Sequence, residues 1–259
     1  MQRVLFHSTI FGPIHSRRLG VSLGVNLSPR NGKVCSFDCL YCEAGFNAQG
    51  PGEAGLPMRE EVRRLLDEKL REMKAAGSNL DVITFSGNGE PTLHPDFAAI
   101  VDDTLALRNR YFPDAKVSVL TNSTRIDRTE VVAALKKVDN NILKLDSAVD
   151  GTIHLVDRPN MPGYSAEKVV AQLKEFRGSG IIQTMILRGE WEGVRIDNST
   201  DAEIAALIEA YREIGPREVM IYSLDRPTPA RTLEKVGEDE LRRIAERITA
   251  ETGIPVKVN

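Results

Sequence analysis

All three cysteines of the 259-residue chain lie in one eight-residue window, Cys35-Ser36-Phe37-Asp38-Cys39-Leu40-Tyr41-Cys42. Cysteines that only fill a core are scattered through a sequence, whereas three thiols this close together can converge on one inorganic centre. A disulfide framework is disfavoured because the cysteine count is odd and no segment suggests export. The window therefore predicts a metal site.

The kind of metal follows from the number of ligands. Structural zinc usually takes four protein ligands in two CxxC pairs, and the second pair is absent. None of the histidines stands at such a spacing from the cysteines: His7, His15, His94 and His154. A 4Fe–4S cluster accepts thiolates from a tight loop, and three of them leave one iron open. The spacing therefore favours an iron–sulfur cluster over zinc.

The spacing CxxxCxxC, with Tyr41 before the last cysteine, resembles the signature of the radical S-adenosylmethionine (SAM) superfamily. This resemblance implies a 4Fe–4S cluster on Cys35, Cys39 and Cys42, with SAM bound at the open iron. It also implies reductive cleavage of SAM to a 5′-deoxyadenosyl radical, which abstracts a hydrogen atom from the substrate. Five further segments resemble the branch related to wyosine-type tRNA-modifying enzymes: Ser16-Arg17-Arg18-Leu19-Gly20, Ser22-Leu23-Gly24-Val25-Asn26, Ser86-Gly87-Asn88-Gly89-Glu90-Pro91-Thr92, Lys144-Leu145-Asp146 and Asp225-Arg226-Pro227.

The chain differs from that branch in one feature that bears on its reaction. Archaeal wyosine-forming relatives carry additional cysteines for a second cluster, and this chain has none. The substrate therefore stays open between a small molecule, a tRNA and a partner protein that the enzyme would activate. The resemblance implies an electron donor such as flavodoxin or ferredoxin. A non-catalytic metal-binding protein is the alternative from another class, and it predicts a chain that does not bind SAM.

The elements that must position this chemistry alternate between short β-branched runs and amphipathic helices, which is typical of βα units around a parallel sheet. The predicted fold is α/β, a partial (β/α)6 TIM-like barrel, in a single domain spanning 1–259. Predicted caps are Thr200 and Ser165 at two helix starts and Gly253 at the last helix end. Strands are predicted over six ranges: 22–27, 80–86, 116–122, 142–146, 181–187 and 218–223.

Polar residues stand where these strands end, which is the reactive edge of such sheets. The Gly87 to Glu90 run follows the second strand, Asn122 ends the third and Asp146 ends the fourth. Because side chains alternate along a strand, Val117 and Val119 are expected to face the helices. The same alternation directs Lys144 and Asp146 to the barrel interior, either as a buried salt bridge or as binding groups.

The resemblance and these positions together assign binding roles. The glycine-rich run would hold the amino group of SAM; read without the resemblance, it would be an ordinary turn. Tyr41 is expected near the adenine, with Tyr222 as a second candidate. Asn122 and Asp146 would bind the ribose or the methionine carboxylate, Lys144 would face SAM or substrate, and Arg188 would hold the SAM carboxylate. The predicted cofactor-binding residues are Tyr41, Gly87, Asn88, Gly89, Glu90, Asn122, Lys144, Asp146, Arg188 and Tyr222.

Arginines follow three successive strands. They are Arg158, Arg188 and Arg226, and Arg17 and Arg18 precede the first strand. Loop arginines are commonly solvated, but guanidinium groups that converge bind carboxylates or phosphates in bidentate geometry. Convergence here would indicate an anionic substrate.

Overall charge and hydropathy bear on the class of substrate and on the location of the protein in the cell. A net charge of -3 gives no global positive field for nucleic acid, which weakens an RNA substrate without excluding it. No stretch reads as a signal peptide or reaches the roughly 18 to 20 apolar residues of a membrane span. We therefore expect a cytoplasmic protein with no membrane association.

Overall fold

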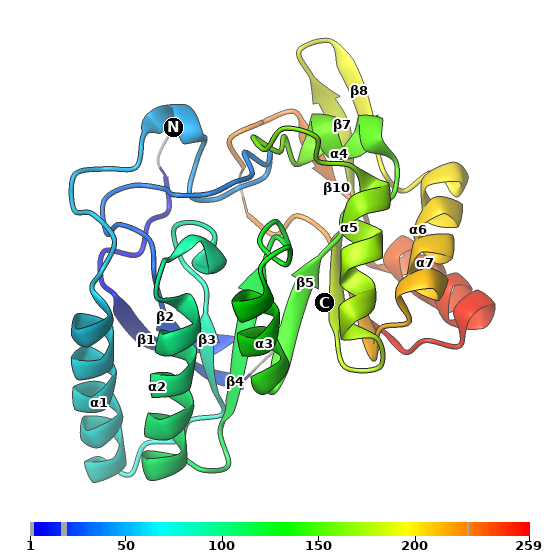
Figure 1. Cartoon of the computed structure of the whole chain (residues 1–259). Coiled ribbons are helices and arrows are strands. Elements are labelled where there is room, and N and C mark those ends of the chain that lie inside the picture. Colours follow the sequence, from blue (N-terminus) through cyan, green and yellow to red (C-terminus); the bar gives the residue numbers. More distant parts are fainter. Residues whose placement is uncertain (1–2, 17–19, 227) are drawn as a thin grey trace.

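In a computed structural model, which describes residues 3–16, 20–226 and 228–259, helices flank an eight-stranded, mostly parallel sheet (Figure 1). Its strand order is β1-β2-β3-β4-β5-β6-β9-β11. Only β1 runs antiparallel to its neighbour, β2. The strands are Ile10–Ser16 (β1), Gly20–Val25 (β2), Val82–Phe85 (β3), Lys116–Thr121 (β4), Asn140–Lys144 (β5), Ile181–Met185 (β6), Glu218–Tyr222 (β9) and Val256–Val258 (β11).

The six predicted strands correspond to β2, β3, β4, β5, β6 and β9, which are consecutive neighbours and all parallel. The α/β partial barrel is therefore confirmed. Two edge strands were not predicted, β1 and β11, and the latter pairs with β9 in parallel. The prediction of one strand over 181–187 is wrong at its end, because Leu187 belongs to a different sheet.

Helices cover one face of the sheet, with α1, α2, α3 and α5 side by side in Figure 1. The predicted caps are confirmed: the Thr200 and Ser165 hydroxyls accept hydrogen bonds from the backbone N–H of Glu203 and Lys168, and Gly253 ends α7 with φ +73°. The helices are Arg59–Ala75 (α1), Phe97–Tyr111 (α2), Thr129–Lys137 (α3), Asp150–Val156 (α4), Ala166–Leu173 (α5), Asp201–Ile214 (α6) and Glu238–Thr252 (α7).

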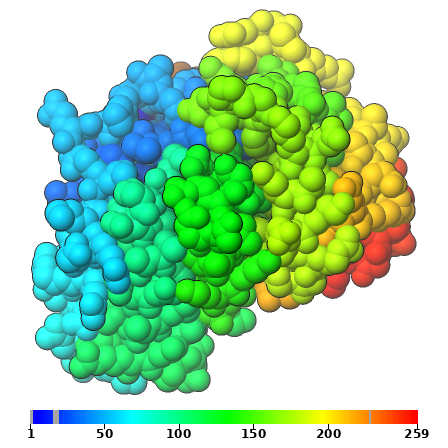
Figure 2. Space-filling view, in the orientation of Figure 1, coloured from blue at the N-terminus to red at the C-terminus, as the bar shows by residue number. Residues whose placement is uncertain are grey.

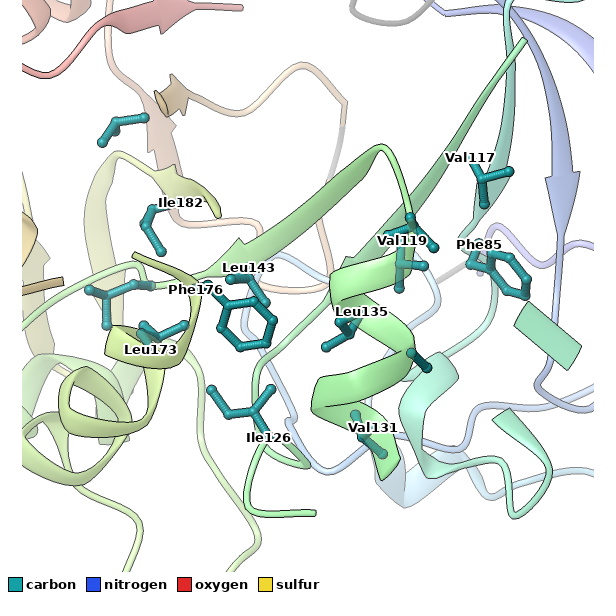
Figure 3. Close-up of a cluster of buried hydrophobic side chains, with 14 of the residues drawn as sticks. Phe85, Val117, Val119, Ile126, Val131, Leu135, Leu143, Leu173, Phe176 and Ile182 are labelled. Atoms are coloured by element: carbon teal, nitrogen blue, oxygen red, sulfur yellow. The ribbon is translucent and has the colours of Figure 1, made fainter. Parts of the chain in front are cut away.

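The core lies between the sheet and these helices. Val119 of β4 lies near Leu135 of α3, Leu143 of β5 lies beside Phe176, and Val117 of β4 lies near Phe85 (Figure 3). These side chains are completely buried. Truncation of a buried leucine such as Leu135 to alanine would cost about 2–5 kcal/mol of stability. The other face of β4 and β5 carries the polar Ser118 and Lys144, together with Leu120 and Ile142 of a smaller hydrophobic cluster.

A second sheet of three antiparallel strands stands beside the main one, in the order β10-β7-β8. Its strands are Leu187–Trp191 (β7), Val194–Asp197 (β8) and Leu233–Lys235 (β10). Glu192 and Gly193 connect β7 to β8 with φ of +51° and +79°, as expected for a type I′ hairpin turn. The hairpin projects at the top of the molecule in Figures 1 and 2. The sequence reasoning did not anticipate this sheet.

Within the described ranges, no helix combines the length and the apolar character needed to cross a membrane.

Candidate functional site

The cysteine loop follows β2 and is held mainly by backbone contacts. The Leu40 N–H donates to the carbonyl oxygen of Val156 at 2.9 Å, and the Asp38 N–H donates to that of Asp157 at 3.0 Å. The Cys42 N–H donates to the carbonyl oxygen of Cys39 at 3.1 Å, which closes a turn. Leu40 is fully buried and anchors the loop in a hydrophobic cluster. The loop is therefore fixed against the C-terminal end of α4.

The three thiols influence one another. Burial and, to a smaller extent, Glu90 raise the pKa of Cys35 to about 12, although Lys33 opposes the shift. Burial also raises the pKa of Cys39, while Lys144 opposes that shift. Negative charge on the neighbouring cysteines disfavours ionisation of both Cys35 and Cys39. The three cysteines therefore lie in one region. A centre that takes up their negative charge would relieve this repulsion.

Lys33 is a buried cation beside the cysteines that the sequence reasoning missed. Its side chain is only 1% exposed, and Nζ donates to the carbonyl oxygen of Gly45 at 2.8 Å and lies 3.5 Å from Asp38 Oδ1. Burial alone would lower the pKa of Lys33, but Cys42, the other cysteines and Asp38 together raise it. Its position two residues before the first cysteine is the signal that could have identified it.

The glycine-rich run is joined to the cysteine loop by backbone pairing. Gly89 forms a β-bridge with Val34, and the Glu90 N–H donates to the Val34 carbonyl oxygen at 3.0 Å. A Cβ on Gly89 would lie 1.9 Å from that oxygen, so only glycine fits there. The fully buried Asn88 side chain bonds to the backbone of Phe6 and Pro29. Gly87, with φ +151°, likewise has neighbouring atoms so close that no side chain would fit.

Glu90 is buried at the end of this run. Its carboxylate accepts from the Thr121 hydroxyl at 2.7 Å, from the Asn122 N–H at 2.6 Å and from the N–H and hydroxyl of Thr92. Burial raises the pKa of Glu90, and these hydrogen bonds oppose the shift. In this structure the carboxylate therefore holds the run to the end of β4, and direct contact with a cofactor stays a prediction.

Asn122, directly after β4, reaches the cysteine loop. Its side-chain Nδ2 donates to Ser36 Oγ at 2.9 Å and toward Cys35 Sγ at 3.6 Å. Its Oδ1 accepts from the N–H and hydroxyl of Thr124, at 3.1 and 2.7 Å. The structure thus brings the predicted strand-end amide into contact with the first predicted metal ligand.

Lys144, Asp146 and Tyr41 form one buried group, together with Asp157. The Lys144 ammonium lies 2.9 Å from Asp157 Oδ1 and in closer contact with Asp146 and the Tyr41 hydroxyl, which also donates to Asp146. Burial raises the pKa of Asp157 to about 7, although Lys144 opposes that shift. Despite burial, Asp146 and Asp157 hold the pKa of Lys144 well above its ordinary value. The Lys144–Asp146 salt bridge, one of the two alternatives for these residues, is present, and their binding roles stay a prediction. Asp157 is a further member of the group that strand alternation could not reveal.

Two of the predicted arginines lie at the cysteine loop and one lies elsewhere. Arg158 is 3.6 Å from Asp38 Oδ2 and packs over the Phe46 ring, and Arg226 is 2.8 Å from Glu43 Oε2. Arg188 of β7 instead pairs with Glu240 of α7 and lies 3.8 Å from Asp197 of β8.

The outcome for the remaining predicted residues differs from one residue to the next. Tyr222, at the end of β9, packs against the cluster that contains Leu40 and Tyr41. The pairing of Arg188 leaves its role toward SAM a prediction. Arg17, Arg18 and Pro227 lie outside the described residues.

The donor set fits an iron–sulfur cluster, because three thiols share one loop next to two lysines. Among the described residues, no three His, Cys, Asp or Glu side chains are grouped so that they could hold one metal ion. The thiols nevertheless share one loop and act on each other's pKa. The charges of Lys33 and Lys144 favour the thiolate forms of Cys35 and Cys39 and would balance an anionic cluster. Cys35, Cys39 and Cys42 are therefore the residues that would hold such a cluster.

Known proteins with similar sequences give a consistent result. The family model described as the radical SAM superfamily matches residues 32–192. The chain is 28% identical over 253 residues to a protein named GTPase Obg of Brachyspira hyodysenteriae, covering 96% of this chain but only 35% of that protein. It is also 28% identical over 275 residues to a UPF0026 protein of Synechocystis, with 96% and 95% of the two chains covered.

Solved structures show the same fold at low sequence identity. A radical SAM methyltransferase from Sphaerobacter thermophilus aligns with a TM-score of 0.65 and 17% identity, over 92% of this chain and 65% of that one. Streptococcus suis SuiB, bound to precursor peptide SuiA, aligns with a TM-score of 0.63 and 16% identity, over 91% and 48%. TYW1 with a lysine-pyruvate adduct aligns with a TM-score of 0.58 and 14% identity, over 88% and 73%.

Proposed function

The chain belongs to the radical SAM superfamily and is a radical SAM enzyme, and we propose that it holds one 4Fe–4S cluster on Cys35, Cys39 and Cys42. When bound, the cluster and SAM supply the reductive cleavage that yields a 5′-deoxyadenosyl radical able to abstract hydrogen from a substrate. The sequence contains no further cysteine, so a second cysteine-ligated cluster has no ligands within it.

The observation that carries this proposal is the meeting of three strand ends at the cysteine loop. Asn122 after β4 contacts Cys35, Lys144 at the end of β5 acts on Cys39, and Gly89 after β3 pairs with Val34. Such convergence at the carboxyl ends of parallel strands is where α/β barrels hold their ligands.

In the proposal each polar group around the cysteine loop has its own role. Lys33 and Lys144 place positive charge near the thiolates, which stabilises a negatively charged centre. Glu90 fixes the glycine-rich run, which in this proposal lies against the methionine part of SAM. Tyr41 and Asp146 hold each other in one orientation, which suits the adenine and ribose contacts proposed for them.

The substrate and the electron donor are further parts of the proposal. Arg158 and Arg226 lie at the cysteine loop, which supports an anionic substrate. We propose a small carrier such as flavodoxin or ferredoxin as reductant and the cytoplasm as the place of action, because a reduced cluster is sensitive to oxygen. Members of this fold act on substrates of very different size, so likeness of fold does not choose among them.

Anaerobic reconstitution with iron and sulfide tests the proposal. We expect about four irons per chain, and 5′-deoxyadenosine after dithionite and SAM are added. Cys39→Ala should lose the cluster and the cleavage, whereas the exposed Arg242→Ala on α7 should retain both. A correctly formed cluster that neither binds nor cleaves SAM would refute the proposal.

A further inference from the structure

A cavity of about 950 Å³ opens between the segment that precedes β1 and the loop that joins β9 to β10. We call it the basic cavity. Its floor includes Leu224 and Leu233, which belong to the hydrophobic cluster around Leu40. Its charged or titratable lining residues are Arg3, His7, Asp225, Arg226, Arg231 and Lys235.

Both walls of the basic cavity are attached to the cysteine loop. The Val4 N–H donates to the carbonyl oxygen of Glu43 at 3.0 Å, and Glu43 directly follows the last cysteine. On the opposite wall, Arg226 pairs with the Glu43 carboxylate at 2.8 Å, and the Ala230 N–H donates to the Leu40 carbonyl oxygen at 3.3 Å. A ligand in this cavity would therefore lie beside the loop that carries the predicted metal ligands.

The charge of the basic cavity is opposite to that of the whole chain. Among the described residues that line it there are four cationic side chains and one carboxylate, although the net charge of the protein is -3. Lys235 is neutralised by Asp225 at 3.0 Å, and Arg226 by Glu43. By contrast, no ion pair joins Arg3 or Arg231 to a carboxylate among the described residues, and the Arg231 side chain is exposed to solvent. Cationic side chains that line a cavity without a carboxylate to neutralise them give it a positive potential, which favours an external anion.

We propose that the basic cavity binds the phosphate group of a small phosphate-ester substrate through Arg3 and Arg231. This inference rests on the proposed function and adds the substrate class to it. Two unneutralised guanidinium groups match the double negative charge of a phosphate ester better than the single charge of a carboxylate. The apolar floor formed by Leu224 and Leu233 is available to the organic part of the molecule.

The distribution of charge favours a small molecule over a nucleic acid. A nucleic acid needs a positive stripe long enough to follow several phosphates. Here a surplus of positive charge lines one cavity, and the chain is acidic overall. The size of the cavity is also at the upper end of the range for small-molecule sites.

Calorimetric titration of the reconstituted protein with phenyl phosphate and with benzoate tests the inference, because the two probes share a ring and differ in the anion. We expect phenyl phosphate to bind more tightly than benzoate, and Arg231→Ala and Arg3→Ala to weaken its binding by about tenfold each. Arg231→Lys should restore part of the affinity. Arg242→Ala, an exposed arginine paired with Glu238 on α7, serves as the matched control.

Equal binding of both probes, no binding of phenyl phosphate, or binding that Arg231→Ala leaves unchanged would overturn the inference. Tight binding of a single-stranded RNA that phenyl phosphate does not displace would overturn it in favour of nucleic acid. SAM cleavage is measured in the same preparations, and the control Arg242→Ala should keep it. If the wild-type protein cleaves SAM but does not bind phenyl phosphate, that result would contradict only the basic-cavity assignment. Absent SAM cleavage would instead contradict the proposed function.

Discussion

The side-chain amide of Asn122 donates toward the sulfur of Cys35 across 3.6 Å, so the end of β4 contacts the cysteine loop directly. The same amide nitrogen holds the Ser36 hydroxyl, and its oxygen accepts from Thr124. One buried side chain thus connects a strand end, the turn that follows it and the first cysteine.

Asn122→Ala is expected to lower the free energy of unfolding by about 1–3 kcal/mol, because buried hydroxyl and N–H groups lose their partners. Urea unfolding under anaerobic conditions measures the change. Asn109→Ala, on the exposed surface of α2, is the control and should shift the midpoint very little. Equal midpoints for the two variants would show that Asn122 does not hold the loop.

Lys144→Met should destabilise the protein by about 3–5 kcal/mol, because it leaves Asp146 and Asp157 buried without a cation. The double variant with Asp157→Asn should recover part of the loss. Lys137→Met, which breaks an exposed pair with Asp102, should cost less than about 1 kcal/mol. Thermal unfolding of the four proteins compares them, and a double variant no more stable than the single one would contradict the pairing.

Asp157 also predicts a dependence of stability on pH. Its pKa in the folded protein is about 7, against an ordinary value of 3.8, so the folded state binds this proton more tightly than the unfolded state. Its contribution to stability is therefore present at low pH and is lost as pH rises from about 4 to about 7. Urea unfolding of wild type and Asp157→Asn at several pH values isolates the effect as a difference. A difference that stays constant with pH would disprove the assignment.

Lys33→Met should make the cluster harder to reduce, since it removes a buried positive charge beside the three thiols. We expect the midpoint potential to fall by on the order of tens of millivolts. A redox titration followed by electron paramagnetic resonance measures it, with iron content verified for each sample. Lys174→Met, at an exposed pair with Glu213, is the control. An unchanged potential in Lys33→Met would show that this charge does not act on the cluster.

Gly89→Ala should disrupt the pairing of the glycine-rich run with the cysteine loop, because the added methyl group would overlap the Val34 carbonyl oxygen. We expect reduced iron incorporation and a clear loss of stability. Gly151→Ala on α4 introduces the same methyl group where nothing lies within 4 Å, and should be neutral or slightly stabilising. Similar iron content in both variants would contradict the expectation.

The sequence was sufficient for the features that depend on local periodicity. The six parallel strands, the helix caps at Thr200 and Ser165 and the inward direction of Lys144 and Asp146 all follow from alternation or capping within one element. The cysteine window and its strand-end neighbours were likewise accessible, because topology brings the carboxyl ends of parallel strands together.

Features that depend on long-range packing were not accessible. Predicting one strand through Leu187 failed because the buried Asn198 side chain accepts from the Leu187 N–H and donates to the Met185 carbonyl oxygen, where the chain changes sheets. Asp157 joins Lys144 from the end of a helix, where strand alternation gives no information. Arg3 reaches Gly45 from the start of the chain, a contact that no local pattern encodes.

The backbone bridge between Val34 and Gly89 has a consequence for protein engineering. Because the spacing of the two loops is set by main-chain pairing, the cysteine loop is not a portable unit on its own. A graft of residues 28–42 into another parallel sheet should fail to take up iron, whereas a graft that also carries residues 86–92 on the neighbouring strand keeps the pairing. The smallest transplantable piece of this protein is therefore a pair of adjacent loops.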